Sequence, residues 1–317
     1  MRVLITGATG CVGRYLVEQL LPNTAHELVL VVRDRARLAI PDGARDRVTV
    51  FEADMRDLDA YAAAAEGVDT AVLVATSWGG EDTYAVTVDA NLALADRLIA
   101  AGCGHILYFA TASVLAQDGA LLPAAERHGT DYIRAKYLLV EGMEKRAKQA
   151  RITGLFPTLV FGGRREAPAI PFSHFANLLT ELWRYVWALR FVSADARFHV
   201  VHAADISTVV RHLIDTPPDE SPGRLVLGNP ANTVDEMMAE LVEQKGKRLR
   251  TLYRLKPAHV DFLVRVLPVT LSPWDRFCVD HPDQSHPGAV NPASYGLPVA
   301  MPRLRDGLAS IGLGRAE

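Results

Sequence analysis

A tyrosine and a lysine four positions apart, Tyr132 and Lys136, form the strongest catalytic signal in this 317-residue sequence. On a helix the two side chains lie one turn apart on the same face. An ammonium about 4 Å from a phenol favours the phenolate by roughly 4 kcal/mol at an effective dielectric constant of about 20, which is about three pKa units. We therefore expect Lys136 to lower the pKa of Tyr132, so that the phenol exchanges a proton with a substrate oxygen. An unreactive surface pair would show the same spacing.

Two hydroxyl side chains, Thr111 and Ser113, follow an apolar run at residues 106–110. At the carboxyl end of a buried strand, such a hydroxyl can bond the reacting oxygen and stabilise charge on it. Thr111 is the first choice for this role and Ser113 the second. Either hydroxyl could instead cap the turn that follows.

Three glycines, Gly7, Gly10 and Gly13, lie between an apolar run at residues 3–6 and a helical pattern. This arrangement seats the pyrophosphate of a dinucleotide. The first glycine permits a tight turn, the second lets the backbone approach the phosphates, and the third lets the helix pack on the strand. The helix start then offers free N–H groups to the anion. The other residues of this loop expected at the cofactor are Thr9, Cys11 and Val12.

The end of the second predicted strand decides the cofactor. Arg33 stands twenty residues after Gly13, where a carboxylate would bond the ribose of NAD and an arginine suits the 2′-phosphate of NADP. NADP is therefore favoured. NAD stays possible, because Asp34 could take the ribose role.

Further cofactor contacts are expected where the third and fourth predicted strands end. Asp54 could accept a hydrogen bond from the adenine amino group, with Met55 against the ring, although Asp54 could also be a helix cap. Ala75 and Thr76 are small enough to let the cofactor lie close.

The elements that would position these residues alternate along the first half of the chain. Nearly continuous apolar runs predict strands at 3–6, 28–32, 48–51, 71–75, 106–110 and 152–156. Helical periodicity lies between them at 14–21, 84–101 and 132–147. The pattern predicts an α/β fold of Rossmann type, a doubly wound parallel sheet with a smaller C-terminal substrate lobe.

The expected domains are a nucleotide-binding unit, 1–162, to which 201–228 returns, and a lobe made of 163–200 and 229–317. Beyond residue 162 we expect an apolar helix over 172–187, helices at 203–214 and 234–244, and a strand at 224–227. An apolar stretch at 260–267 and a proline-rich loop at 268–302 follow.

Bulk properties exclude several classes of function. A net charge of −3 gives no footprint for nucleic acid or an anionic membrane. Three cysteines suit a reducing compartment, and the chain shows no secretory signal, so we expect a cytoplasmic protein. Residues 280–286 hold aspartates and histidines, but without standard ligand spacing, and no metal is expected.

Together these motifs resemble the short-chain dehydrogenase/reductase superfamily, and specifically its extended branch of epimerases, dehydratases and reductases. The resemblance covers residues 1–162 well and continues faintly at 201–205 and 227–229. It implies that Tyr132 is the general acid–base, that Lys136 binds the nicotinamide ribose, and that Thr111 replaces a serine. It also implies that Asn91 shapes the site. Residues 157–160, among them Pro157 and Leu159, would run along the nicotinamide, and helices 84–101 and 132–147 would form a homodimer.

The expected function is NADP-dependent hydride transfer between the nicotinamide and a ketone or secondary alcohol. Trp78, Phe172 and Trp183 could line an apolar pocket for a hydrophobic small molecule, or belong to the core. One alternative is a nucleotide-sugar epimerase with tightly bound NAD, in which Arg197 would hold a phosphate; Arg197 could equally be a surface ion pair. The other is a non-catalytic NADP sensor, although such proteins lose the tyrosine–lysine pair.

Overall fold

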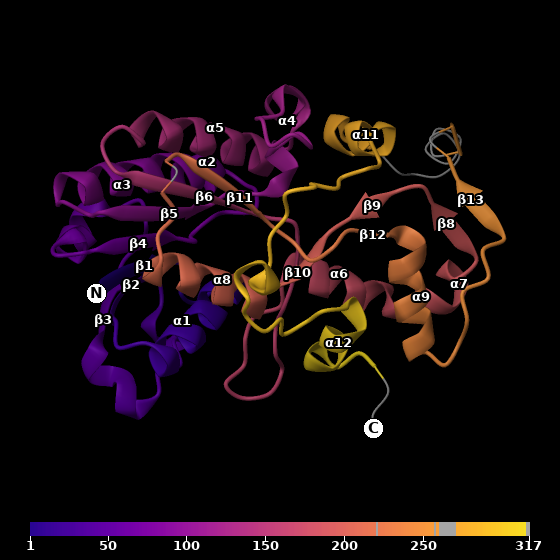
Figure 1. The fold of residues 1–317 in the computed structure, drawn as a ribbon, viewed down its shortest axis with the longest axis horizontal. Coiled ribbons are helices and arrows are strands. Elements are labelled where there is room, and N and C mark those ends of the chain that lie inside the picture. Colours follow the sequence, from indigo (N-terminus) through magenta and orange to yellow (C-terminus); the bar gives the residue numbers. More distant parts are fainter. Residues whose placement is uncertain (220, 257, 260–270, 315–317) are drawn as a thin grey trace.

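The computed structural model describes residues 1–219, 221–256, 258–259 and 271–314. In this part of the chain, seven parallel strands form the central sheet, in the order β11-β6-β5-β4-β1-β2-β3 (Figure 1). The strands are β1 (Arg2–Thr6), β2 (Glu27–Val32), β3 (Val48–Glu52), β4 (Thr70–Leu73), β5 (His105–Phe109), β6 (Arg151–Pro157) and β11 (Gly223–Leu227). The winding reverses between β1 and β4, where ligands of doubly wound sheets bind. The predicted fold class is confirmed.

Apolar sequence explains why the sheet lies in the middle of the molecule. Every residue of β4 and β5 is buried, as continuous apolar strands covered on both faces should be. Ile5 in β1 lies in register with Leu30 in β2 and Val72 in β4. The strands predicted from apolar runs therefore occur within a residue or two of their expected positions.

Two pairs of helices cover the two faces of the sheet (Figure 1). On one face α1 (Cys11–Asn23) packs against α8 (Ala203–Asp215), and their Leu16 and Val209 join one apolar core. On the other face lie α3 (Asn91–Ala100) and α5 (Asp131–Arg146), whose Leu94 and Val140 join a second core. These two cores fix where the helices begin and end relative to the strands.

The predicted helix at 84–101 is interrupted. It consists of α2 (Asp82–Tyr84), a π-helical segment η4 (Ala85–Ala90), and α3. Single π-turns of this kind often occur at functional sites. The short segments around the sheet are the 3₁₀ turns η1 (Arg35–Arg37), η2 (Asp42–Arg47), η3 (Leu58–Ala65) and η5 (Ala112–Val114), and the helix α4 (Pro123–His128).

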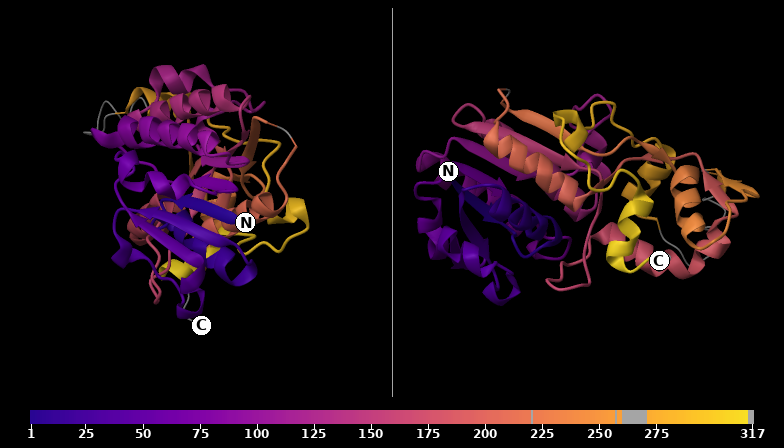
Figure 2. Two further views of the ribbon diagram at one scale, coloured as in Figure 1. Left: turned by 90° about the vertical axis from the view of Figure 1, so that its left-hand side faces the viewer. Right: turned by 60° about the horizontal axis from the view of Figure 1, so that its bottom comes forward.

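A smaller lobe lies at the other end of the elongated molecule (Figure 2). Its helices and turns are α6 (His174–Leu182), η6 (Trp183–Tyr185), α7 (Val186–Leu189), α9 (Val234–Gln244), α12 (Leu304–Leu308) and η8 (Ala309–Ile311). Of the other C-terminal elements, α11 (Pro273–Asp280) packs against α4 and η7 (Pro292–Tyr295) packs against α8. Its strands, and those that lead into it, are β7 (Leu159–Phe161), β8 (Val192–Ala194), β9 (Arg197–Phe198), β10 (Val200–His202), β12 (Asn232–Thr233) and β13 (Tyr253–Leu255). A third apolar core fills this lobe.

Three expectations for the second half need comment. The apolar helix expected over 172–187 is broken into α6, η6 and α7. The proline-rich loop expected at 268–302 contains α11, which begins at a capping box between Ser272 and Asp275 with Pro273 in its first turn. The apolar stretch predicted at 260–267 lies outside the described residues.

Candidate active site

The glycine loop adopts a conformation that side chains would block. Gly7 has φ +69°, and a Cβ there would lie 2.9 Å from the backbone nitrogen of Ala75. A Cβ on Gly13 would lie 2.2 Å from the carbonyl oxygen of Gly7. Helix α1 begins after Gly10 without a side-chain cap. Its first N–H groups therefore have no side-chain cap, and a helix start of this kind binds anions. Binding of a pyrophosphate at this loop stays a prediction.

Thr6 joins the end of β1 to the residues that follow β4. The Oγ1 of Thr6, at the end of β1, accepts hydrogen bonds from the backbone N–H groups of Val74 and Ala75, both at 3.1 Å. The end of β4 is thereby fixed opposite the glycine loop. The sequence analysis missed Thr6, although a polar residue between a fully apolar strand and Gly7 was a visible signal.

The end of β2 presents Arg33 rather than Asp34 as the available charged group. The carboxylate of Asp34 accepts a hydrogen bond from the backbone N–H of Ala36 at 2.9 Å and so caps η1. The exposed Arg33 lies close enough to Asp54 to lower the pKa of that carboxyl further. The main cause is Arg56, whose hydrogen bonds lower the pKa of Asp54 to about 2.

Two neighbouring side chains do not lie as the sequence suggested. Met55 is buried in the sheet core, where its carbonyl accepts a hydrogen bond from the Tyr61 hydroxyl at 2.7 Å. Asp54 is occupied by Arg56, so its carboxylate must exchange partners to bond an adenine. Arg14, which the sequence analysis did not select, is buried in α1 and donates a hydrogen bond to the carbonyl of Arg37 at 2.8 Å. It braces the loop that follows β2.

Asn91 acts on the site through the backbone. It is 1 % exposed, and its Nδ2 donates hydrogen bonds to the carbonyls of Ala75, Val86 and Thr87 at 3.2, 2.9 and 3.2 Å. The hydroxyl of Thr87 in turn lies 3.1 Å from that of Thr76. This network joins the π-helical segment to the end of β4. Asn91 is therefore a positioning residue in this structure, in agreement with the role that the resemblance implied.

The predicted pair lies on α5, next to the end of β5. The hydroxyl of Thr130 caps the helix, so Tyr132 sits in its first turn. The ammonium of Lys136 donates a hydrogen bond to the carbonyl of Phe109 at 2.6 Å, and its Nζ lies 5.9 Å from the centroid of the Tyr132 ring. Among the described residues the Tyr132 hydroxyl forms no hydrogen bond, so it is available to a ligand.

The expected effect of the lysine on the tyrosine is wrong for this structure. Burial raises the pKa of Tyr132 above its usual value, because the phenolate would lose its water. Burial also lowers the pKa of Lys136, to about 7. The ammonium donates its hydrogen bond to Phe109 and lies over the Tyr132 ring without bonding its hydroxyl, and desolvation is the cause of both pKa shifts. Tyr132 is a neutral phenol near pH 7, and a neutral phenol is a proton donor.

An aromatic side chain from the loop after β4 covers this tyrosine. The ring of Trp78 stacks on that of Tyr132 with centroids 4.3 Å apart and planes 9° apart, yet Trp78 is 56 % exposed. Its other neighbour is the ring of His174, the first residue of α6, at a centroid distance of 3.8 Å. Trp78 thus bridges the sheet and the smaller lobe above the phenol. His174 was not selected from the sequence, because nothing local connects it to residue 132.

The hydroxyls chosen from the sequence lie together where β5 ends. Thr111 is the cap of η5, and its Oγ1 lies 3.4 Å from both the Oγ and the backbone nitrogen of Ser113. The capping alternative is therefore realised. The hydrogen bonds at 3.4 Å are long enough to be exchanged for a better acceptor.

The remaining predicted residues are spread over the molecule. Pro157 ends β6 and Leu159 begins β7, beside the carboxyl end of the sheet. Cys11 and Val12 begin α1, and burial raises the pKa of the Cys11 thiol to about 12. Thr9 precedes them in the glycine loop.

The residues chosen for the substrate do not form one cluster. Trp183 lines an apolar cavity in the smaller lobe. Phe172 instead packs against Gly163 and under the guanidinium of Arg165. Arg197 is exposed on β9. Hydrogen bonds from Ser285 and Thr233 are the main causes that lower the pKa values of Asp283 and Glu236, and the charge of Arg197 adds to both effects. This placement favours the surface-charge alternative for Arg197.

Two searches bear on other classes of site. Among the described residues, no three histidine, cysteine, aspartate or glutamate side chains gather where they could hold a metal ion. Within the same residues, every helix is too short or too polar to cross a membrane.

Comparisons with known proteins agree with this geometry. The sequence model of a family described as NAD(P)H-binding matches residues 7–150. The chain is 26 % identical over 250 residues to Quinone oxidoreductase 2 of Escherichia coli (strain K12), covering 78 % of this chain and 76 % of that protein.

Solved structures share the fold. MoeE5 in complex with UDP-glucuronic acid and NAD has a TM-score of 0.66 at 19 % identity, covering 98 % of this chain and 97 % of that one. The dTDP-glucose 4,6-dehydratase DesIV of Streptomyces venezuelae, with NAD and TYD bound, has a TM-score of 0.62 at 18 % identity, covering 80 % and 85 %.

Residues 7–150 therefore match an NAD(P)H-binding family, and the chain shares the fold of these solved structures, in line with its resemblance to the extended short-chain dehydrogenase/reductase superfamily. The expectations of an NAD(P)-binding domain and of an NAD(P)-dependent enzyme are confirmed at this level.

Proposed function

We propose that this enzyme reduces ketones with NADPH. Hydride passes to the carbonyl carbon, the phenol of Tyr132 gives its proton to the carbonyl oxygen, and a secondary alcohol and NADP⁺ leave. The observation that carries the proposal is Tyr132 itself: it lies in the first turn of α5, one turn from the Lys136 that binds the end of β5, and its hydroxyl forms no hydrogen bond within the described residues. Burial raises the pKa of this phenol. A proton donor at that place suits reduction better than oxidation.

The chain's own residues would hold the cofactor at both ends. Bound NADPH supplies the hydride. The glycine loop and the uncapped start of α1 would bind its pyrophosphate, and Arg33 its 2′-phosphate. Two features favour NADP over NAD: Asp34 already bonds the N–H of Ala36, and Arg14 braces the carbonyl of Arg37 in the same loop.

The groups around the phenol would orient the substrate. Thr111 and Ser113 can turn their hydroxyls toward the carbonyl oxygen and donate hydrogen bonds to it. These hydrogen bonds would strengthen as negative charge develops on that oxygen. Lys136 ties α5 to β5 through the carbonyl of Phe109, and so fixes Tyr132 one turn away. Trp78 covers the phenol and keeps water from it.

The rival enzymatic function is nucleotide-sugar epimerisation. It is favoured by the similar structures, several of which hold NAD with a nucleotide or nucleotide sugar. Against it, Arg197 is exposed on β9 and is close enough to the carboxylates of Asp283 and Glu236 to favour their charged forms. The relative from Escherichia coli, by contrast, is named as a quinone oxidoreductase, which supports oxidoreduction rather than epimerisation. A sensor without activity would have no use for the Tyr132–Lys136 pair.

One set of measurements separates these functions. The absorbance of the purified protein shows whether a cofactor is retained, fluorescence titration compares NADPH with NADH, and the oxidation of NADPH is followed with methyl nonyl ketone. We expect a cofactor-free protein that prefers NADPH and oxidises it only with the ketone. Retained NAD together with epimerisation of UDP-glucose would establish the rival, and NADPH binding without turnover of any carbonyl compound would establish the sensor.

We also propose that the enzyme acts as a cytoplasmic homodimer. The surfaces predicted to meet are residues 84–101 and 132–147, and Leu138 on α5 exposes 37 % of its surface there. Analytical ultracentrifugation of the wild type and of Leu138→Glu tests the interface: the variant should sediment as a monomer.

A further inference from the structure

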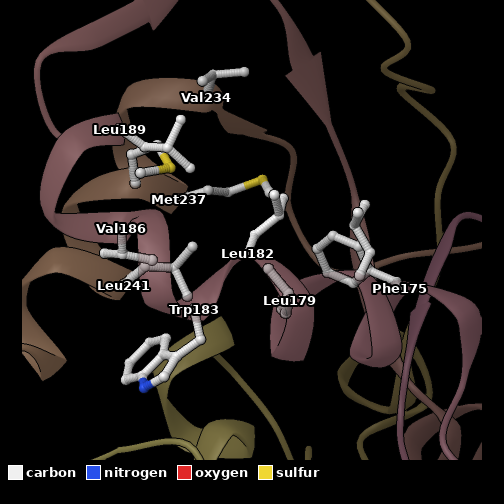
Figure 3. Close-up of a pocket in the computed structure, with 11 residues that line it drawn as sticks. Phe175, Leu179, Leu182, Trp183, Val186, Leu189, Val234, Met237 and Leu241 are labelled. Atoms are coloured by element: carbon white, nitrogen blue, oxygen red, sulfur yellow. The ribbon is translucent and has the colours of Figure 1, made fainter.

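An apolar cavity of about 160 Å³ lies in the smaller lobe, between α6, α7 and α9 (Figure 3). Eleven side chains line it, and all of them are apolar. A closed apolar cavity of about this size stays dry and takes up hydrocarbon. A hydroxyl, carbonyl or phosphate group placed here would lose its hydrogen bonds to water without replacement, which costs several kcal/mol. The lining thus suits hydrocarbon and excludes a nucleotide.

Helix α6 links the cavity to the residues around Tyr132. His174 begins this helix and contacts Trp78, which stacks on Tyr132. The next residue, Phe175, already lines the cavity, and Leu182 lines it seven residues later. At 1.5 Å per residue the two are about 11 Å apart along the helix axis. Helix α6 therefore contacts Trp78 through its first residue, and its later residues line the cavity.

We propose that this cavity binds the hydrocarbon tail of the substrate. The inference rests on the proposed ketone reduction and names its substrate class: a ketone whose carbonyl reaches Tyr132 and whose unbranched or prenyl-like tail follows α6 to Trp183. Trp183 lines the cavity just after α6 ends, and the ammonium of Lys245 lies 4.3 Å from the centroid of its ring. Tails that extend past this indole meet a charged, exposed rim.

The cavity should make substrate binding depend on the length of the alkyl tail of the ketone. Burying one methylene group lowers the binding free energy enough to tighten binding by about fourfold. The KM should therefore fall by about fourfold for each methylene added to a methyl alkyl ketone, and level off once the tail reaches Trp183. The kcat should change little, because the reacting carbonyl stays at the same place.

The test uses a variant that fills the cavity and a control that does not. Met237 lines the cavity, and Met237→Trp should occupy it. Leu252 is 78 % exposed and is not among the lining residues, so Leu252→Trp adds the same side chain elsewhere. With methyl nonyl ketone we expect the KM of Met237→Trp to rise more than tenfold, with methyl ethyl ketone to stay within twofold, and Leu252→Trp to match the wild type.

A binding measurement makes the inference independent of catalysis. Nonyl alcohol is titrated calorimetrically into the wild type and both variants without cofactor. The cavity is supported as the tail site if nonyl alcohol binds to the wild type and to Leu252→Trp but not to Met237→Trp. If Met237→Trp does not fold, the dependence of the wild-type KM on chain length decides the question. Absence of binding to the wild type, or a KM that does not depend on tail length, overturns the inference. Binding of nonyl alcohol without turnover of any ketone would instead overturn the proposed function.

Discussion

The buried ammonium of Lys136 makes a quantitative prediction about stability. Its side chain is 2 % exposed, and its pKa falls from 10.5 to about 7 in the folded protein. Above pH 10.5 neither state binds the proton. As the pH falls, the unfolded chain takes it up first, so stability is lost down to the folded pKa of about 7 and changes no further below it. The difference of 3.5 units, at 1.36 kcal/mol each, is about 5 kcal/mol.

The assay is urea unfolding of the wild type and Lys136→Met in steps across this window. The free energy of unfolding of the wild type, relative to the variant, should rise by up to about 5 kcal/mol from pH 7 to pH 10.5. The hydrogen bond to Phe109 that the variant loses shifts its curve by a constant amount and does not affect this slope. Lys145→Met, on the exposed end of the same helix, controls for the loss of a charge. Parallel curves for the wild type and Lys136→Met would refute the reasoning.

Three further changes follow from the site. Arg33→Ala should weaken NADPH binding by about 10- to 100-fold, since hydrogen bonds to a charged group contribute about 1.5–3 kcal/mol; NADH binding, measured by the same fluorescence titration, should be unchanged, and equal losses for both would exclude a 2′-phosphate contact. Gly13→Ala should abolish cofactor binding, because the new Cβ would lie 2.2 Å from the carbonyl oxygen of Gly7; a titration with wild-type affinity would show that the cradle is assigned wrongly. Trp78→Ala should lower the pKa of Tyr132 by admitting water, which ultraviolet titration against Tyr132→Phe detects; an unchanged tyrosine titration would mean that the indole does not shield the phenol.

The scaffold could be predicted because its main features depend on residues that are neighbours in the sequence. The glycine loop follows from the residues around Gly13, and the strands from continuous apolar runs that only a sheet covered on both faces buries. The helix at 84–101 shows the limit of such patterns. Its periodicity predicts a helix, but not the π-helical segment, which Asn91 joins to the loop after β4 by a hydrogen bond to the carbonyl of Ala75.

Features that depend on distant residues could not be predicted. The spacing of Tyr132 and Lys136 gave the right helix face but the wrong pKa direction, since spacing does not reveal that Trp78 covers the phenol or that Phe109 binds the ammonium. His174 lies 96 positions from Trp78 in the sequence, and only the packing of the smaller lobe on the sheet brings the two rings together. The catalytic candidates follow from motifs, but their electrostatics follow from burial.

The central claim, that Tyr132 is the proton donor in an NADPH-dependent reduction, is tested most directly by Tyr132→Phe. The phenylalanine ring keeps the stacking partner of Trp78, so folding and NADPH affinity should stay as in the wild type. Single-turnover oxidation of bound NADPH by methyl nonyl ketone should slow by about 100- to 10,000-fold, the contribution of a positioned general acid. A variant that binds NADPH normally and oxidises it at the wild-type rate would contradict the account.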